Sequence, residues 1–339
     1  MTYYELVMQE IKLNPKVWLV TGAAGFIGSN LTEALLRLNQ KVVGLDNFST
    51  GRQSNLDDIK RFVSANQWAN FTFIKGDIRN LDDCLKACHG VDIVLHQAAL
   101  GSVPRSIENP IATNESNIVG FLNMLVAARD SKVKRFIYAA SSSVYGDHPQ
   151  LPKQEDITGK PLSPYAVTKV VNELYAQVFA NLYSMQIIGL RYFNVFGKRQ
   201  NPSGAYAAVI PKWIDALLNK QSVLIHGDGS NSRDFCYIEN AIQANILAAL
   251  TTNETALNQS YNVAVGDRIT LQALYEFLAQ EIVKYKTGLQ VQPPIYGPPR
   301  VGDIPHSIAD ISKARTNLNY EPQFNVRKGL VEAIVSYLN

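Results

Sequence analysis

The chain has 339 residues, of which 46% are hydrophobic and 18% are charged, and its formal net charge is +3. These values are typical of a folded globular protein with room for two sub-domains, and they exclude a disordered chain. The charges are scattered, so no basic patch predicts binding to nucleic acid, and no apolar run approaches the roughly 18 residues that span a membrane. The N-terminus lacks the basic and apolar regions of a signal peptide, the three cysteines are few, and the histidines show no metal-ligand spacing. We therefore expect a cytoplasmic protein without a metal site.

Apolar segments bounded by turn residues alternate with amphipathic segments over the first 196 residues. Buried strands are predicted at 16–22, 41–46, 71–77, 91–99, 135–142 and 185–194, and helices at stretches such as 30–38 and 118–130. This rhythm predicts an α/β fold with a doubly wound parallel sheet of the Rossmann type, preceded by an N-terminal helical extension. From residue 197 the segments become shorter and richer in proline and glycine. We expect residues 1–196 to bind a dinucleotide and residues 197–339 to form a smaller mixed α/β substrate domain, with the chain free to cross between them.

The first motif is "TGAAGFIGSN" at 21–30, between a predicted strand and a predicted helix. Gly22 permits a tight turn, Gly25 lets the backbone approach a pyrophosphate, and Gly28 lets the helix pack on the strand. Asp46 ends the next strand, where a carboxylate binds the ribose 2′-hydroxyl of a dinucleotide and repels a 2′-phosphate. The motif therefore predicts NAD as the cofactor, in preference to NADP.

The second motif is "SPYAVTK" at 163–169, which places Tyr165 and Lys169 four residues apart. Ser163 is a suitable N-cap and Pro164 a suitable first helical residue, so both side chains are expected on one helical face. A tyrosine with its usual pKa near 10 becomes a base at neutral pH only if that pKa falls by roughly three units. We expect the charges of Lys169 and of the nicotinamide ring of NAD⁺ to lower it. On an ordinary helix the same spacing would place a tyrosine in the core and a lysine in solvent, but here it follows a dinucleotide motif.

Nine segments stand in the order seen in a known family. They are "TGAAGFIGSN", "DNFSTG", "GDIRN", "HQAA", "SSSVYG", "SPYAVTK", "RYFNVFG", "RDFCYIEN" and "RVGDIPHSIAD". In these segments the sequence resembles the extended short-chain dehydrogenase/reductase family over nearly its whole length. Within that family it is most similar to the nucleotide-sugar 4-epimerases that act on UDP-N-acetylglucosamine and UDP-N-acetylgalactosamine.

The resemblance implies a role for each matching position. For the adenosine half of the cofactor it implies Asp77 and Ile78 at the adenine and, at the ribose, Asp46, Asn47, Ser49, Thr50 and Gly51. For the pyrophosphate it implies Gly22, Gly25, Phe26, Ile27 and Gly28, and for the middle of the dinucleotide Gln97, Ala98 and Ala99. For the nicotinamide half it implies Asn117, Tyr165, Lys169 and Tyr192. At the UDP-sugar it implies Gly101, Ser102, Val103, Ser141, Ser142, Ser143, Asn194, Ala208, Val209, Lys212, Leu224, Ile225, His226, Arg233, Arg300, Asp303 and Ser307. Two arginines suit a diphosphate because guanidinium groups match phosphate oxygens.

The resemblance also implies the reaction. Tyr165, assisted by Ser141 and Lys169, would remove the proton of the sugar 4-hydroxyl while C4 gives a hydride to NAD, and the 4-keto sugar would turn over and take the hydride back on its other face. Sugar 4,6-dehydratases of the same fold carry an Asp-Glu pair where this chain has Ser142 and Ser143. Two hydroxyls supply neither the acid nor the base that removal of water requires, so dehydration is disfavoured.

Two positions bear on the sugar. Members restricted to UDP-glucose and UDP-galactose carry a tyrosine at the position of Ser307 and a lysine at that of Gly101, so the small residues here predict room for a 2-acetamido group. A UDP-glucuronate or UDP-glucose 4-epimerase and a catalytically silent NAD-binding regulator are the alternatives, and the intact Ser141, Tyr165 and Lys169 argue against the silent protein. The family suggests a homodimer packed through two helices of each subunit.

Overall fold

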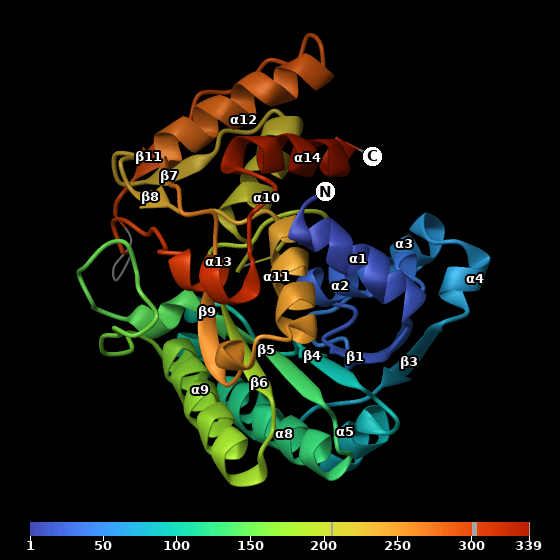
Figure 1. Ribbon diagram of the computed structural model, residues 1–339. Coiled ribbons are helices and arrows are strands. Elements are labelled where there is room, and N and C mark those ends of the chain that lie inside the picture. The colour runs from blue at the N-terminus through green and yellow to red at the C-terminus, as the bar shows by residue number, and fades with distance from the viewer. Residues whose placement is uncertain (205, 300–303, 339) are drawn as a thin grey trace.

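The computed structural model describes residues 1–204, 206–299 and 304–338. At its centre lies a seven-stranded parallel sheet (Figure 1) in the order β3-β2-β1-β4-β5-β6-β9. The strands are β1 (Val17–Thr21), β2 (Lys41–Asp46), β3 (Phe71–Lys75), β4 (Ile93–His96), β5 (Arg135–Ser141), β6 (Ile187–Tyr192) and β9 (Gln259–Val263). The order reverses beside β1, where the carboxyl ends of a doubly wound sheet form a ligand-binding crevice.

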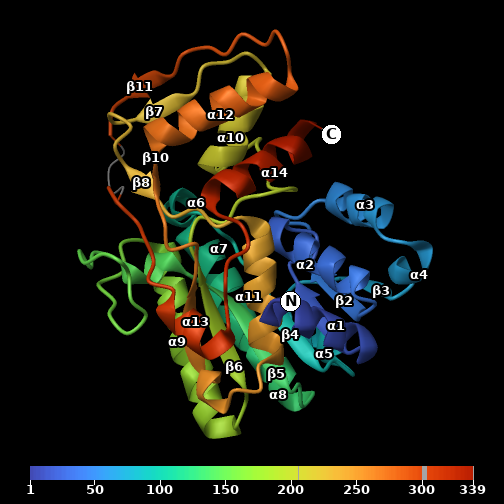
Figure 2. The same ribbon diagram turned by 45° about the horizontal axis from the view of Figure 1, so that its top comes forward.

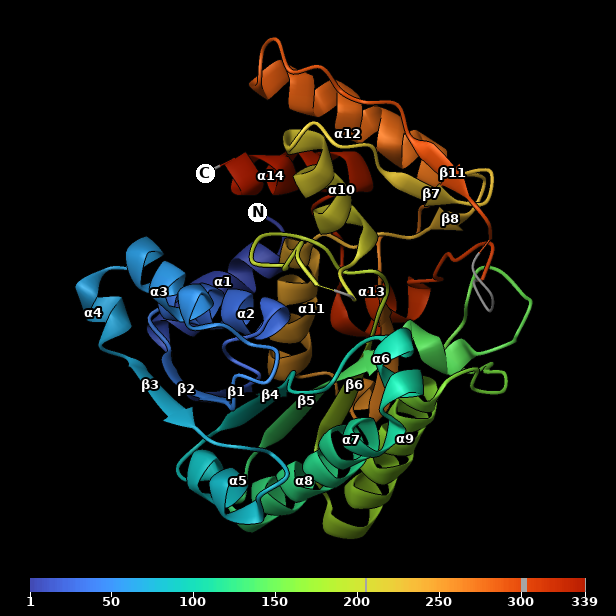
Figure 3. The same cartoon turned by 180° about the vertical axis from the view of Figure 1, so that it is seen from behind.

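The two faces of the sheet are covered by different helices, as the views from front and back show (Figures 1 and 3). One face carries α5 (Leu81–Cys88), α8 (Gly120–Asp130) and α9 (Pro164–Tyr183), and the other carries α2 (Phe26–Arg37) and α11 (Ile238–Leu250). The N-terminal helix α1 (Tyr3–Leu13) packs on α11. Because helices cover both faces, the central strands are buried on both sides, and β4 and β6 are buried at every residue.

The smaller part of the molecule stands beyond the carboxyl ends of the strands (Figure 2). It contains α10 (Val209–Leu218), α12 (Leu271–Tyr285) and α14 (Val326–Leu338). Two short sheets complete it, one pairing β7 (Leu224–His226) with β11 (Ile295–Gly297) and the other β8 (Ser232–Arg233) with β10 (Ile269–Thr270). It therefore forms a cap over the crevice of the larger sheet.

Short elements connect the main ones. They are α3 (Gln53–Phe62), α4 (Ala65–Trp68), α6 (Val103–Glu108), α7 (Pro110–Asn114), a π-helix at Glu115–Val119, 3-10 turns at Ser142–Tyr145 and Glu254–Ala256, and α13 (Ser312–Leu318).

The six predicted strands and the parallel α/β fold are confirmed. The seventh strand, β9, was not predicted, and it joins the large sheet beside β6 although it follows residue 197. Helix α11 likewise packs on the large sheet, so the chain crosses back from the cap. A domain boundary at residues 196 and 197 remains a prediction, with α11 and β9 as later parts of the larger half.

Candidate active site

Two cavities lie at the carboxyl ends of the strands of the large sheet. The first is lined by residues at or just after the ends of β1, β2, β3 and β4 and has a volume of about 280 Å³. Most of the predicted cofactor residues line it: Gly22, Gly25, Phe26, Ile27, Gly28, Asp46, Asn47, Ser49, Thr50, Ile78, Gln97, Ala98 and Ala99. Gly101, which was predicted at the sugar, also lines it, as do Leu45, Gly76 and Ser116, which were not predicted. The structure therefore brings the glycine motif and the ends of four strands together.

The glycine loop has the geometry of a phosphate-binding turn. Gly22 has φ of 69°, in the region that favours glycine, and a Cβ on Gly28 would lie 2.0 Å from the carbonyl oxygen of Gly22. Gly25 is the N-cap of α2 and offers no side chain to its first N–H groups, so these remain available to an anion. These features fit the pyrophosphate of a dinucleotide.

Asp46 ends β2 and lines the first cavity. Its carboxylate is 8% exposed and accepts hydrogen bonds from the backbone N–H of Ala24 (2.9 Å) and of Phe48 (2.7 Å). Burial raises the pKa of Asp46, although these backbone bonds oppose the rise. A Cβ on Gly51 would lie 2.9 Å from both Asp46 oxygens, so Gly51 packs against the carboxylate and does not line the cavity.

Asp77, which was predicted at the adenine, does not line the cavity and is held by two neighbours. It accepts a hydrogen bond from Asn47 Nδ2 (2.8 Å) and pairs with Arg79 (2.7 Å), whose hydrogen bond lowers the pKa of Asp77 to about 2. Asp77 is thus an anion at neutral pH and fixes Asn47, which lines the cavity.

The predicted catalytic residues come together at the start of α9. The helix begins at Pro164, with Ser163 as N-cap accepting from the backbone N–H of Ala166 (3.1 Å), as predicted. Lys169 is 5% exposed, and its Nζ lies 5.9 Å from the centre of the Tyr165 ring and donates to the carbonyl of Ala139 (2.7 Å). Half-buried Tyr165 and buried Lys169 therefore lie on one face of α9, against the end of β5.

Two serines at the end of β5 complete this group. Ser141 acts on Tyr165 by lowering its pKa, and Ser143 Oγ donates to Ser141 Oγ (2.9 Å). Ser142, half-buried beside them, opens the 3-10 turn. Neither Ser142 nor Ser143 brings a charge to the site.

Burial works against the expected charge states. It raises the pKa of Tyr165, while the hydrogen bond with Ser141 lowers it, and it lowers the pKa of Lys169 to about 8. A lowered tyrosine pKa is therefore absent from the protein alone and would require the positive nicotinamide ring that NAD supplies when bound. That part of the expectation stays a prediction.

The end of β6 carries a closed set of hydrogen bonds that includes one residue not predicted. Tyr192 donates to Gln97 Oε1 (3.0 Å) and accepts from Asn245 Nδ2 (2.8 Å), while Gln97 Nε2 donates to Asn245 Oδ1 (3.2 Å). Asn245 is fully buried on α11. The only feature of the sequence that marks Asn245 as a candidate is its place as an asparagine within the apolar run "AIQANILAAL".

Asn117 lies in the π-helix and holds the loop that follows β4. Its side chain accepts from the backbone N–H of Leu100 (2.7 Å) and donates to the Leu100 carbonyl (3.1 Å) and to Thr168 (3.2 Å). Asn117 does not line the cavity itself, but these bonds fix the loop next to Ala98 and Ala99, which do.

The second cavity, of about 290 Å³, lies between the end of β6 and the cap. The predicted substrate residues that line it are Asn194, Ala208, Val209, Lys212, Leu224, His226 and Arg233, and it is completed by Val195, Phe196, Ala207, Ile210, Trp213, Phe235 and Leu271, which were not predicted. It combines apolar side chains with two cations, a lining that suits a nucleotide base and its phosphates.

The remaining predicted substrate residues lie elsewhere. Ile225 is fully buried behind the cavity, and Ser102 and Val103 begin α6 without lining either cavity. Ser307 donates its backbone N–H to the carbonyl of Ser232 (3.0 Å), next to Arg233. Arg300 and Asp303 lie outside the described residues.

Asp234 fixes the loops around the second cavity. It is fully buried and accepts from the backbone N–H of Val265 (3.0 Å), Gly266 (3.0 Å) and Ala309 (3.3 Å). Burial raises its pKa to about 6, against the lowering effect of these bonds. No group of three or more histidine, cysteine or acidic residues that could hold a metal occurs within the described ranges, and no helix there is long and apolar enough to cross a membrane.

Comparisons with known proteins agree with this geometry. The model of the NAD dependent epimerase/dehydratase family matches residues 18–264. A putative UDP-glucose 4-epimerase of Methanocaldococcus jannaschii is 35% identical over 318 residues, covering 93% of this chain and 96% of that protein.

Two solved structures are similar along nearly the whole chain. One is a UDP-N-acetylglucosamine 4-epimerase from Methanobrevibacter ruminantium in complex with UDP-N-acetylmuramic acid, with 37% identity, a TM-score of 0.85, and coverage of 96% of this chain and 98% of that one. The other is a UDP-glucuronic acid 4-epimerase from Bacillus cereus with UDP-glucuronic acid and NAD, with 31% identity, a TM-score of 0.83, and coverage of 94% and 98%. The chain therefore belongs to the NAD dependent epimerase/dehydratase family, and its cofactor is NAD.

Proposed function

We propose that this member of the NAD dependent epimerase/dehydratase family interconverts UDP-N-acetylglucosamine and UDP-N-acetylgalactosamine by inversion at C4 of the sugar. It is an NAD-dependent UDP-sugar 4-epimerase, and the acetylated substrate is the finer part of the proposal. The observation that carries it is the group formed by buried Lys169 and half-buried Tyr165 and Ser141 at the start of α9 and the end of β5. The end of β6 joins the two cavities, because Tyr192 hydrogen-bonds a wall residue of the first and Asn194 lines the second.

Each residue of this group has one task in the reaction. Tyr165 takes the proton of the 4-hydroxyl and returns it after inversion, and Ser141 hydrogen-bonds that hydroxyl and orients it. Lys169 contributes positive charge beside Tyr165 and binds the ribose of the cofactor. When bound beside these residues, NAD would supply the acceptor and donor of the C4 hydride.

The uridine diphosphate supplies binding energy away from the reacting carbon. We place it in the second cavity, with Lys212 and Arg233 at the diphosphate and the apolar wall at the base. A firmly bound diphosphate leaves the sugar free to turn over between the two hydride transfers.

Two small residues favour an acetylated sugar. Nothing lies within 4 Å of a Cβ placed on Gly101, so the wall is open there. The bond between the Ser307 N–H and Ser232 brings Ser307 beside the diphosphate residue Arg233. The open wall at Gly101 and the small side chain of Ser307 support the proposal, because a larger residue at either position would restrict a 2-acetamido group.

The substrate is tested by incubating the purified protein with the UDP derivatives of N-acetylglucosamine, N-acetylgalactosamine, glucose, galactose and glucuronate and resolving the products by NMR. We expect the two acetylated sugars to interconvert with the highest kcat/KM. Preferred turnover of UDP-glucuronate or UDP-glucose would refute the substrate, and no 4-epimerisation of any of them would refute the function.

We also propose a homodimer that packs through two helices of each subunit, of which α9 is one. Helix α9 exposes Val167, Leu174, Val178 and Leu182 on one side, at spacings of seven, four and four residues. Such an apolar stripe suits an isologous helix-to-helix contact between two copies. Light scattering after size-exclusion chromatography should give twice the chain mass, and Leu174→Asp should reduce it to one; a monomeric wild type would contradict the proposal.

A further inference from the structure

Helix α9 carries a third polar residue on the face that holds Tyr165 and Lys169. Glu173 follows Lys169 by four residues, so it lies one turn further along the same face. It is also the charged group that acts on Lys169 in opposition to burial. Residues at this spacing interact directly, so a change at Glu173 should be felt at Lys169.

Glu173 is held in one geometry by an arginine on β6. Arg191 donates Nε to one carboxylate oxygen (2.8 Å) and Nη2 to the other (2.7 Å), and the two side chains are 6% and 18% exposed. A buried ion pair usually gives less stability than apolar side chains of the same size, because both charges lose their water. Stability alone is therefore a poor explanation for this pair, whereas a planar two-point contact fixes position well.

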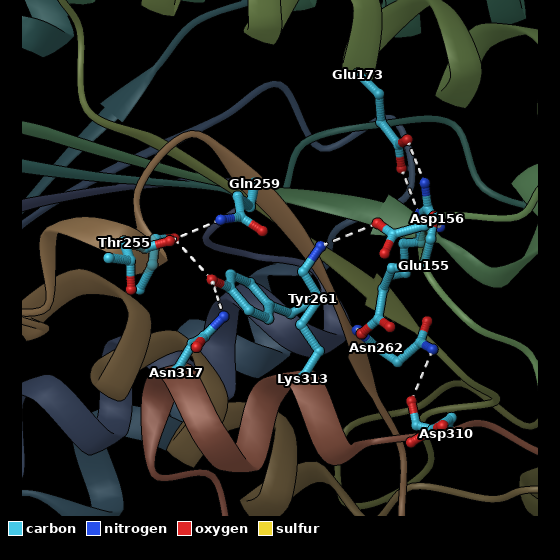
Figure 4. Close-up of polar contacts among 12 residues, drawn as sticks. Glu155, Asp156, Glu173, Thr255, Gln259, Tyr261, Asn262, Asp310, Lys313 and Asn317 are labelled. Atoms are coloured by element: carbon cyan, nitrogen blue, oxygen red, sulfur yellow. Dashed lines mark hydrogen bonds and ion pairs between the residues drawn. The ribbon is translucent and has the colours of Figure 1, made fainter.

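The pair continues into a buried network that reaches the cap. Arg191 Nη1 also donates to Tyr145 Oη (3.1 Å) and to the Glu155 carbonyl (2.8 Å), and Tyr145 donates to Asn262 Oδ1 (2.6 Å). Figure 4 shows Glu173 above Asp156 and Glu155, with Asn262 extending toward Asp310. Asn262 Nδ2 donates to the carbonyl of Asp310 (2.9 Å), three residues after Ser307. Through Glu173, helix α9 is thus connected by hydrogen bonds to β6, to β9 and to the segment that contains Ser307.

The charges around Lys169 can be named for each element that packs on it. The titratable groups that contact or act on Lys169 are Tyr165 and Glu173 of α9 and His96 of β4, while Tyr138 of β5 and Arg191 of β6 interact with Glu173. His96 is fully enclosed, and burial together with Lys169 lowers its pKa to about 3, so it is neutral. Tyr138 is neutral as well, because burial raises its pKa. Glu173 is therefore the carboxylate that offsets the burial of Lys169.

We propose that Glu173 is a positioning residue for the epimerase reaction: its two-point bond with Arg191 fixes α9 against β6, and its negative charge keeps Lys169 an ammonium ion beside Tyr165. The proposal rests on the proposed function for its kinetic consequence and on the geometry for its effect on Lys169.

The chain offers a matched control for this charge. Asp156 lines the same polar cavity of about 270 Å³ as Glu173, but it is 88% exposed and pairs with Lys313 (3.5 Å) rather than with the catalytic helix. Asp156→Asn therefore removes one negative charge from the cavity without touching the pair with Arg191.

The test compares Glu173→Gln and Asp156→Asn with the wild type in two measurements. The first follows Lys169 by NMR in protein labelled with [ε-¹³C]lysine, its signal being identified by its absence from Lys169→Met. Removing a negative charge disfavours the ammonium form, so the titration midpoint of Lys169 should fall in Glu173→Gln on the order of one pH unit, a tenfold change in its proton affinity. The second is kcat/KM against pH, in which the alkaline limb should move down by the same amount in Glu173→Gln and stay in place in Asp156→Asn.

Each outcome has a defined meaning. The proposal would be overturned if the titration midpoint of Lys169 were the same in Glu173→Gln, Asp156→Asn and the wild type, and if the alkaline limb of kcat/KM were likewise the same in all three. Because Glu173→Gln leaves Arg191 buried without its partner, the double variant Glu173→Gln, Arg191→Gln replaces Glu173→Gln if that variant fails to fold, with a smaller downward shift expected because a positive charge is removed as well. A wild type that epimerises no UDP-sugar would refute the proposed function, whereas the NMR titration would still decide the role of Glu173.

Discussion

Glu33 on α2 is a buried carboxylate whose loss should weaken the junction between the cofactor half and the cap. Its side chain is 4% exposed and pairs with Arg37 (2.8 Å), Lys198 (2.8 Å) and Arg199 (2.5 Å), and Arg199 is itself 4% exposed and also pairs with Asp58 (2.6 Å). Replacing Glu33 by glutamine keeps the shape but leaves the buried Arg199 guanidinium with one carboxylate partner in place of two. Breaking a buried pair costs about 3 kcal/mol at the lower end of measured values, and the retained Asp58 favours that end. We therefore expect the midpoint of thermal unfolding at neutral pH to fall by roughly 4 °C.

The effect should depend on pH with a defined sign. Burial alone would raise the pKa of Glu33, but Arg199 and Lys198 outweigh it, and the pKa in the folded protein is lowered. A group of this kind stabilises the fold above its unfolded pKa of about 4.3, and the stabilisation is lost as the pH falls through the folded value. The difference between the wild type and Glu33→Gln should therefore be full at neutral pH and shrink on acidification below about pH 4.

The matched control is Glu115→Gln, which removes an exposed carboxylate 3.7 Å from Arg79. An exposed pair contributes between about 0 and 1 kcal/mol, so this variant should unfold close to the wild type. Equal unfolding midpoints for Glu33→Gln and Glu115→Gln at neutral pH would refute the reasoning, as would a difference that grows on acidification.

Three further predictions concern the site. Tyr165→Phe should keep the fold and the cofactor but lower kcat by at least the roughly 10²–10⁴-fold that loss of a general base costs, and Ser141→Ala should cost less; near wild-type rates for Tyr165→Phe would remove it from catalysis. Since the cofactor must return its own hydride, heat-denatured protein should release close to one NAD per subunit, and Asp46→Ala should release less; active protein that holds no NAD and needs none added would contradict this. Ser307→Tyr should abolish turnover of the acetylated UDP-sugars and spare UDP-glucose, because a ring in occupied space costs about 1–3 kcal/mol; equal loss on both substrate classes would show damage to the fold instead.

The larger half of the fold could be predicted because its strands are apolar at nearly every position. Each of the six predicted strands overlaps an observed one, and the start of α9 was found from Ser163 and Pro164 alone. The glycine loop could be predicted as well, because a turn with positive φ and a close helix contact require glycine at fixed spacing.

The missed features depend on contacts between distant parts of the chain. Strand β9 is only half apolar ("QSYNV"), and its place beside β6 follows from pairing across about 70 residues. Asn245 resembles an ordinary core residue until the fold brings it to Tyr192, which lies 53 residues earlier. The sign of the shift in the Tyr165 pKa could not be foreseen either, because burial is a property of the assembled site.

The central claim is that C4 of a UDP-N-acetylhexosamine loses a hydride to the bound NAD and takes the same hydride back. The most direct measurement uses UDP-N-acetylglucosamine deuterated at C4, incubated with the purified protein in ordinary water and followed by NMR. The account predicts UDP-N-acetylgalactosamine that retains the deuterium at C4. Product with hydrogen from water at C4, or no inversion at C4, would contradict it.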